Sequence, residues 1–287
     1  MSPRKLKKSL QRDLRAKRKN KHRSRLIGGG LLLLLLSGGG YLVWNNQRPA
    51  ALLQQGLRLE QQTRLEEALQ TYQTLYEEYL ASPEAGDALF RSGQILQHDR
   101  GEDQRALLNY LLLEKNHPQS EHILAARREA ADLTKYRLND CTQAVPVYQR
   151  LIEQSADNAE RYQYEIADCY ARQENWSQAA IEFETLCNSY PQSDLKQIAN
   201  YRLADALLLS GQRQEARSRF EALAGETPTS QLVEEARFRL AEMLEEDEQL
   251  REALRAYSQL THYPRQELLK QKILKLKERM ARKKKVL

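Results

Sequence analysis

Residues 190–208 read YPQSDLKQIANYRLADALL, and residues 227–244 read TPTSQLVEEARFRLAEML. Each stretch is followed by a segment in which an alanine precedes an aromatic residue by four positions. Residues at i and i+4 lie on one face of a helix. The pair occurs six times, with spacings of 38, 38, 35, 37 and 37 residues between the alanines, and this recurrence predicts one supersecondary unit stacked repeatedly. The six pairs are Ala68/Tyr72, Ala106/Tyr110, Ala144/Tyr148, Ala179/Phe183, Ala216/Phe220 and Ala253/Tyr257.

Two further marks recur with the pairs. A small residue lies upstream of each pair, at Gly56, Gly93, Ala131, Ala167, Ala204 and Ala241, and closing prolines stand at Pro83, Pro118, Pro191, Pro228 and Pro264. Small residues let two antiparallel helices approach, and a proline ends the second helix. The fold class predicted is all-α: a right-handed helical solenoid of about twelve helices over residues 50–264. A capping helix should follow at about 265–284, with Leu268, Leu269, Ile273, Leu276 and Met280 on one apolar stripe.

The turns inside the units are predicted at Gly101, Asn139–Asp140, Asn175 and Gly211. The third unit is the least regular, because it lacks the closing proline and carries Pro146 where its second helix should run. A proline there removes a backbone hydrogen bond and is expected to bend or delay the helix.

These marks resemble the tetratricopeptide repeat family over residues 52–264. The two stretches quoted first look like the extended-spacing subgroup of bacterial cell-envelope proteins, which includes the periplasmic coordinator of the Tol–Pal machinery and the lipoprotein of outer-membrane barrel assembly. A membrane anchor followed by periplasmic repeats also resembles the small inner-membrane protein that accompanies the Sec translocon, although this chain is longer. The resemblance implies a protein-binding surface.

Charge is distributed unevenly along the chain. The 287 residues carry a net charge of +6, but residues 1–25 alone carry +11 and residues 270–287 carry +8. The part between them, residues 26–269, carries −13. The basic isoelectric point is therefore a property of two tails, and it gives no support for specific nucleic-acid binding by the repeats.

An uncharged segment follows the basic N-terminus. Residues 26–44 read LIGGGLLLLLLSGGGYLVW, and a helix of this length spans about 28 Å, close to the apolar core of a bilayer. Because Lys and Arg concentrate before it, the positive-inside rule predicts a cytoplasmic N-terminus and a periplasmic remainder. The predicted organisation is a basic cytoplasmic segment (1–25), a transmembrane helix (26–44), a linker (45–51), six repeats (52–264), and a capping helix with a basic tail (265–287), in a single-pass protein of the inner (plasma) membrane.

Other interpretations of the N-terminal region remain open. A signal peptide could be cleaved after Gly40, although the basic region is long and apolar residues continue to Trp44. The basic segment could be a nucleic-acid arm, although its position before an apolar span already explains it. With the reverse topology, the repeats would be a cytoplasm-facing adaptor.

Cysteine is sparse, at Cys141, Cys169 and Cys187, and no Cys-x-x-Cys pair occurs. Neither a zinc site nor a redox dithiol is indicated. Cys169 and Cys187 are expected near opposite ends of one helix pair, which favours small buried side chains over a disulfide between them.

The resemblance also implies where a partner binds. First helices of such repeats line a concave face, with positions 5 and 9 pointing into it. Position 5 holds Phe90, Arg128, Tyr164, Tyr201 and Phe238, and position 9 holds Gln94, Asp132, Asp168, Asp205 and Glu242. The Lys and Asn that clamp a C-terminal carboxylate in chaperone-adaptor repeats are absent. The predicted partner-binding residues come from the three most regular repeats: Tyr164, Asp168, Tyr201, Asp205, Phe238 and Glu242.

An aromatic row beside an acidic row predicts a groove for an extended or helical segment with basic and apolar side chains. The alternative is that the aromatic rings pack against the next repeat and the carboxylates form a solvated face. No phosphate loop, nucleophile elbow or paired-carboxylate site is present in the sequence, and the five histidines are scattered. We expect a non-enzymatic scaffold of the cell envelope with a protein partner and with no cofactor, catalytic residue, metal or small-molecule substrate. The competing hypothesis is a binder of membrane surfaces or polyanions that acts through its basic tails.

Overall fold

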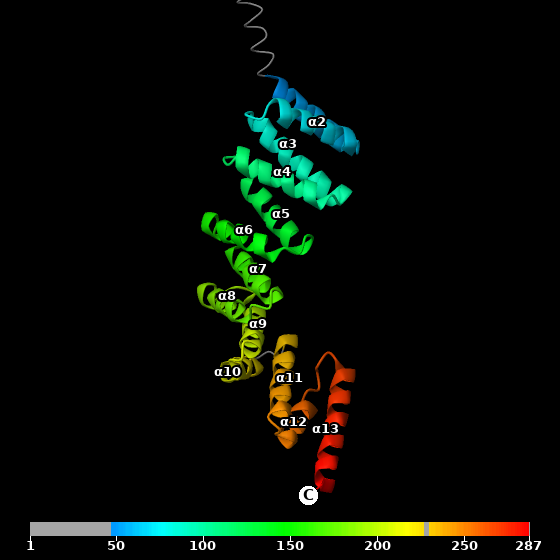
Figure 1. Ribbon diagram of the computed structural model, residues 1–287, viewed down its shortest axis with the longest axis vertical. Coiled ribbons are helices and arrows are strands. Elements are labelled where there is room, and N and C mark those ends of the chain that lie inside the picture. Colours follow the sequence, from blue (N-terminus) through cyan, green and yellow to red (C-terminus); the bar gives the residue numbers. More distant parts are fainter. Residues whose placement is uncertain (1–46, 227–229, 287) are drawn as a thin grey trace, which may run out of the picture. The chain divides into compact units, whose positions relative to one another are not determined.

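The computed structural model describes residues 47–226 and 230–286, and every regular element in these residues is helical (Figure 1). The first helix covers residues 47–61, and a short π-helix, η1 (Ile95–Arg100), extends α3. The predicted all-α fold class is confirmed. The other helices are α2 (Leu65–Glu78), α3 (Pro83–Gln94), α4 (Asp103–Asn116), α5 (Ile123–Tyr136), α6 (Cys141–Gln154), α7 (Ala159–Arg172), α8 (Trp176–Ser189), α9 (Lys196–Leu209), α10 (Arg213–Ala224), α11 (Gln231–Glu246), α12 (Leu250–Ser258) and α13 (Gln266–Val286).

The predicted basic segment (1–25) and transmembrane helix (26–44) lie outside the described residues, as does Pro228. The predicted linker is helical from residue 47 onward. Among the described residues, no helix combines the length and the apolar character needed to cross a bilayer.

The chain divides into two compact units. The first contains the helix over residues 47–61, α2, α3, η1 and the segment Lys115–His122. The second contains Glu102–Glu114, which is most of α4, and the chain from Ile123 onward.

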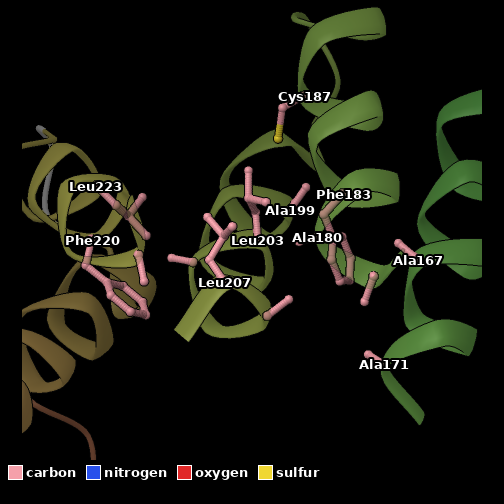
Figure 2. Close-up of a cluster of buried hydrophobic side chains, with 14 of the residues drawn as sticks. Ala167, Ala171, Ala180, Phe183, Cys187, Ala199, Leu203, Leu207, Phe220 and Leu223 are labelled. Atoms are coloured by element: carbon pink, nitrogen blue, oxygen red, sulfur yellow. The ribbon is translucent and has the colours of Figure 1, made fainter. Parts of the chain in front are cut away.

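The six alanine–aromatic pairs are the centre of the packing. All twelve side chains are at most 1% exposed, as expected if each pair closes the gap between two antiparallel helices. Figure 2 shows one such region of the second unit, in which Phe183 of α8 lies toward Ala167 of α7. Leu203 and Leu207 of α9 fill the space between α8 and α10 in the same cluster.

In the first unit, the close approach of the Tyr72 ring requires a glycine at position 56. A methyl group added at Gly56 would lie 2.3 Å from Cε1 of Tyr72, the aromatic member of the first pair. The Tyr72 hydroxyl donates a hydrogen bond to Glu60 Oε2 at 2.9 Å. The helix over residues 47–61 and α2 are therefore fixed against each other by a glycine contact and a polar contact to the same ring.

In the second unit, helices α5 to α13 pack in chain order, each on the next (Figure 1). The last helix, α13, covers the apolar side of α11 and α12 with Leu269 and Leu276, which are 4% and 0% exposed. Leu268, Ile273 and Met280 pack at the edge of the same cluster. The predicted terminal helix and its apolar stripe are confirmed.

The turns fall where the sequence predicts them. Gly101 and Gly211 have φ of 66° and 87°, the left-handed region that favours glycine. The side chains of Asp140 and Asn175 accept hydrogen bonds from backbone N–H groups at the starts of α6 and α8. The expectation that Pro146 delays the second helix of its repeat is wrong, because α6 begins five residues before it and continues to Gln154.

The prediction for the cysteines needs correction. Cys141 at the start of α6 and Cys169 of α7 form a disulfide, with their Cα atoms 5.2 Å apart. Cys187 is buried and free, as expected for a small core residue. The spacing in the sequence draws attention to Cys169 and Cys187, whereas the packing of α6 on α7 brings Cys141 to Cys169.

Candidate functional site

The six predicted groove residues lie on three helices of the second unit, α7, α9 and α11. Each helix contributes an aromatic residue and, one turn later, an acidic residue. Side chains of one helix reach the next: Arg202 of α9 contacts Asp168 of α7, and Arg239 of α11 contacts Asp205 of α9. The structure therefore joins the three helices into one row, which we call the first-helix row.

The aromatic members of the row pack against the second helix of their own repeats. Tyr164 meets Phe183 edge-on at a ring-centroid distance of 5.6 Å, and Tyr201 meets Phe220 in the same way at 5.8 Å. The two tyrosines are only partly buried, and burial raises the pKa of both phenols. They can present ring edges and hydroxyls to a partner.

Phe238 differs from these two tyrosines. It is 3% exposed, stacks on Tyr263 at 4.5 Å and contacts the ring of Tyr257 at 5.4 Å. The alternative interpretation, in which the aromatic residue belongs to the core, describes Phe238 well. The exposed aromatic surface of the row therefore comes from the tyrosines of α7 and α9.

The acidic members of the row are paired with cations two helices further along the chain, on α9, α11 and α13. Asp168 Oδ1 lies 2.8 Å from Arg202 Nη2, and Asp205 Oδ1 lies 3.2 Å from Arg239 Nε. Glu242 Oε1 lies 3.0 Å from Lys272 Nζ of α13. Three carboxylates alternate with three cations, so the row carries balanced charge rather than the acidic charge that the sequence indicates.

A buried lysine adds to this network. Lys135 of α5 has no exposed surface, and its Nζ lies 2.5 Å from Glu165 Oε2 and 2.8 Å from Asp168 Oδ2 of α7. The Tyr136 hydroxyl also donates to Glu165 Oε2. A buried cation is tolerated only when such partners surround it.

The pKa values of the two aspartates of the row are shifted in opposite directions by their surroundings. Burial alone would raise the pKa of Asp168, but hydrogen bonds from Lys135 and Arg172, with the charge of Arg202, hold that pKa below its usual value. Burial raises the pKa of Asp205, and the charge of Arg239 offsets this only in part. Asp168 is therefore a stabilised anion, whereas Asp205 carries a desolvation cost.

Part of this pairing had a sequence signal. Arg202 directly follows Tyr201, and Arg239 directly follows Phe238, in the two stretches that define the repeat. A basic residue after the aromatic position of these two repeats indicates cations next to the acidic row, whereas Tyr164 is followed by Glu165. Lys135 has no such repeated signal, and only the packing of α5 on α7 reveals its partners.

The comparisons with known proteins agree with the helix-pair arrangement. Residues 53–121 and 133–194 match the model of the tetratricopeptide repeat family. No curated protein matches the chain.

Several solved structures are similar to the chain. A tetratricopeptide repeat protein from Parabacteroides merdae ATCC 43184 is 19% identical, with 80% of this chain and 84% of that chain covered and a TM-score of 0.39. MamA from Desulfovibrio magneticus RS-1 is 16% identical, with 61% and 92% covered and a TM-score of 0.43. YrrB, described as a TPR protein with an unusual peptide-binding site, is 15% identical, with 63% and 88% covered and a TM-score of 0.46.

Tetratricopeptide repeat proteins are generally non-catalytic scaffolds for protein–protein interaction. The match over residues 53–121 and 133–194, the helix pairs of the described residues and the buried alanine–aromatic pairs lead to one conclusion: the matched part of this chain consists of tetratricopeptide repeats.

Proposed function

We propose that this chain is a membrane-anchored interaction scaffold of the bacterial cell envelope, and that it binds a segment of a protein partner along the first-helix row. The observation that supports the binding site is the combination of two half-buried tyrosines, Tyr164 and Tyr201, with alternating charges on packed helices. Aromatic residues held by packing give contact area at low entropic cost, and for this reason they dominate many binding surfaces.

The charge pairing refines the nature of the partner. Because Asp168, Asp205 and Glu242 already have cationic neighbours, they add little to the binding free energy of a purely basic segment. The site fits an extended or helical segment that has apolar side chains for the tyrosines and charges of both signs for the ion pairs. Binding that depends on the tyrosines weakens little with salt, whereas long-range steering by exposed charge weakens strongly.

The proposed location is the inner membrane, with residues 26–44 as a single span, residues 1–25 in the cytoplasm and the repeats in the periplasm. The charge difference across the apolar segment supports this orientation. The disulfide between Cys141 and Cys169 also supports it, because structural disulfides persist in oxidising compartments such as the periplasm and are rare in the cytoplasm. One member of the envelope subgroup that the repeats resemble, the coordinator of the Tol–Pal machinery, is likewise periplasmic.

Reporter fusions test the topology. Alkaline phosphatase fused after the C-terminus is expected to be active, and a cytoplasmic reporter at the same place is expected to be silent. The reverse result would contradict a periplasmic location and would favour a cytoplasm-facing adaptor. A loss of about 4 kDa on maturation would indicate that the N-terminal segment is cleaved rather than retained as an anchor.

Site-specific photocrosslinking in cells tests the binding row. A crosslinking amino acid at Tyr201 is expected to capture a discrete partner, and the same group at Ile181 of α8 is the control, because Ile181 is 55% exposed and belongs to a second helix. Tyr164→Ala should abolish capture at position 201 while the helix content is unchanged. Equal capture from both positions would contradict the assignment of the row.

A second candidate function has one observation in its favour. Helix α13 exposes Lys275, Lys277 and Arg282, which have no ion-pair partner in the described part of the chain. An exposed cationic helix face attracts anionic lipid, at about 1 kcal/mol per basic residue near the surface. Flotation with vesicles that contain anionic lipid would detect this activity. It should disappear at high salt and in a Lys275→Glu, Lys277→Glu variant, whereas partner capture at Tyr201 should persist.

A further inference from the structure

Three potential ligand side chains meet in the first unit, away from the first-helix row. Asp87 belongs to α3, and Glu121 and His122 lie in the segment between α4 and α5. Their ligand atoms, one from each side chain, all lie within 4.8 Å of one another. The sequence gives no indication of this cluster, because Asp87 and His122 are 35 positions apart and the histidines have no helical spacing.

The distances suit coordination of one ion. His122 Nε2 lies 3.4 Å from Asp87 Oδ1 and 3.7 Å from Glu121 Oε1. Two ligand atoms that are each about 2.1 Å from a tetrahedral zinc ion are about 3.4 Å apart. An ion placed between the imidazole and the two carboxylates would therefore reach all three with small side-chain movements.

The fold orients the imidazole toward the carboxylates. The His122 ring stacks on Phe90 of α3, with centroids 4.6 Å apart and planes 10° from parallel. The His122 backbone N–H donates to Ser120 Oγ at 3.2 Å, which holds the turn before α5. The ring plane and the direction of Nε2 are thus fixed by α3 itself, the helix that also carries Asp87.

The surroundings leave negative charge for a cation. Asp87 is partly buried, and the carboxylates of Glu121 and Glu84 lie near it, as do His122 and Arg91. A pocket opens beside Asp87 and Glu121, and His117 lines it too. The His117 Nε2 atom is buried and has no hydrogen-bond partner among the described residues.

We propose that Asp87, Glu121 and His122 bind one divalent transition-metal ion of the zinc class, with the fourth coordination position directed to the pocket that His117 lines. An imidazole ligand favours zinc, nickel or copper over calcium and magnesium, which prefer oxygen ligands only. The ion would tie α3 to the segment between α4 and α5 and would leave one position for water, for His117 or for a ligand from a partner protein.

A protonated His122 that forms only ion pairs with the two carboxylates would give similar distances, and metal binding distinguishes the two cases. The full chain is purified in a mild detergent without an oligohistidine tag and titrated with zinc chloride by calorimetry. Saturable binding of one zinc per chain is expected, whereas calcium chloride should give no heat of binding. Zinc binding that fails to saturate by about 100 µM free ion, where a micromolar site would be about 99% filled, would refute the proposal.

Three variants assign the ligands. Glu121→Gln, Asp87→Asn and His122→Gln should each weaken zinc binding by at least about tenfold. Glu121 is 83% exposed at its side chain, so its substitution leaves the fold intact even if the others do not. The matched control is His98→Gln at an exposed histidine of the same unit, which should bind zinc like the unaltered chain. Unchanged affinity in Glu121→Gln, or an equal loss in His98→Gln, would overturn the site.

Discussion

Loss of the disulfide between Cys141 and Cys169 is expected to destabilise the helices that it joins, α6 and α7. The bond closes a loop with a sequence separation of 28 residues. In the chain-entropy model, closing a loop of this length lowers the conformational entropy of the unfolded chain by about 12 cal/mol/K, which raises the free energy of the unfolded state by about 3.6 kcal/mol at 25 °C. The expected destabilisation of a Cys141→Ala, Cys169→Ala variant is therefore about 3–4 kcal/mol.

Hydrogen exchange is the suitable assay, because a repeat array does not always unfold in a single step and stability differs along it. Backbone amides of α6 and α7 should exchange faster in the double variant, and amides of α12 and α13 should change little. The matched control is Cys187→Ala. Cys187 is equally a core cysteine but has no disulfide, and its replacement should cost about 1 kcal/mol.

Thiol counting gives an independent check. Protein made with its own N-terminal segment and denatured without reductant should show one reactive thiol, that of Cys187. A reductant should release two more and should bring the exchange of α6 to the level of the double variant. Three reactive thiols before reduction, or exchange of α6 that is insensitive to reductant, would refute both the bond and the support that it gives to a periplasmic location.

Four further substitutions test the ion pairs, the packing of the first unit and the binding row. Asp168→Asn should lower the free energy of unfolding by about 2–3 kcal/mol at pH 7, because Lys135 loses a charged hydrogen-bond partner. Since the folded-state pKa of Asp168 is depressed, the stability that Asp168 contributes is present above its unfolded pKa and is lost as the pH falls through its folded pKa. Unfolding measured at pH 7 and at acidic pH should therefore show that the difference in stability between the variant and the unaltered chain disappears in acid. The folded-state pKa of Asp205 is raised, so the stability that its shift contributes is present at low pH and is lost as the pH rises. Asp205→Asn should therefore lower the free energy of unfolding by less than about 1 kcal/mol at pH 7. A larger loss than in Asp168→Asn would contradict the ion-pair analysis. Gly56→Ala should destabilise the first unit by about 1–3 kcal/mol through contact with Tyr72, measured by exchange of α2 amides, and unchanged protection there would show that the ring can move aside. Tyr201→Ala should weaken partner binding by about 2 kcal/mol with thermal unfolding nearly unchanged, whereas unfolding of the array would place this ring in the core instead.

Much of the fold follows from the sequence because its determinants are local. The alanine and the aromatic residue of each pair are four positions apart, so a helix places them on one face whatever lies around it. Six repetitions then require the same helix pair six times, and all twelve side chains are buried in the structure. The left-handed glycines Gly101 and Gly211 and the capping residues Asp140 and Asn175 are local in the same sense.

The candidate site could be predicted only in part. The sequence places Tyr164, Asp168, Tyr201 and Asp205 at equivalent positions of successive repeats, and the structure brings them into one row. The sequence does not show which of these side chains remain available to a partner. Phe238 is equivalent to Tyr201 in sequence, yet it is buried, because Tyr263 in the segment between α12 and α13 stacks on it.

Tertiary structure alone decided the pairings. The bond of Cys141 to Cys169, the contacts of Lys135 with Glu165 and Asp168, and the approach of His122 to Asp87 join residues 28 to 35 positions apart. At that separation the chain leaves several partners within reach of each group, and the angle and register at which two helices pack select one of them. The sequence determined that helix pairs form and repeat, because that depends on contacts within one turn; the packing of one pair on the next determined which thiols, charges and ligands meet.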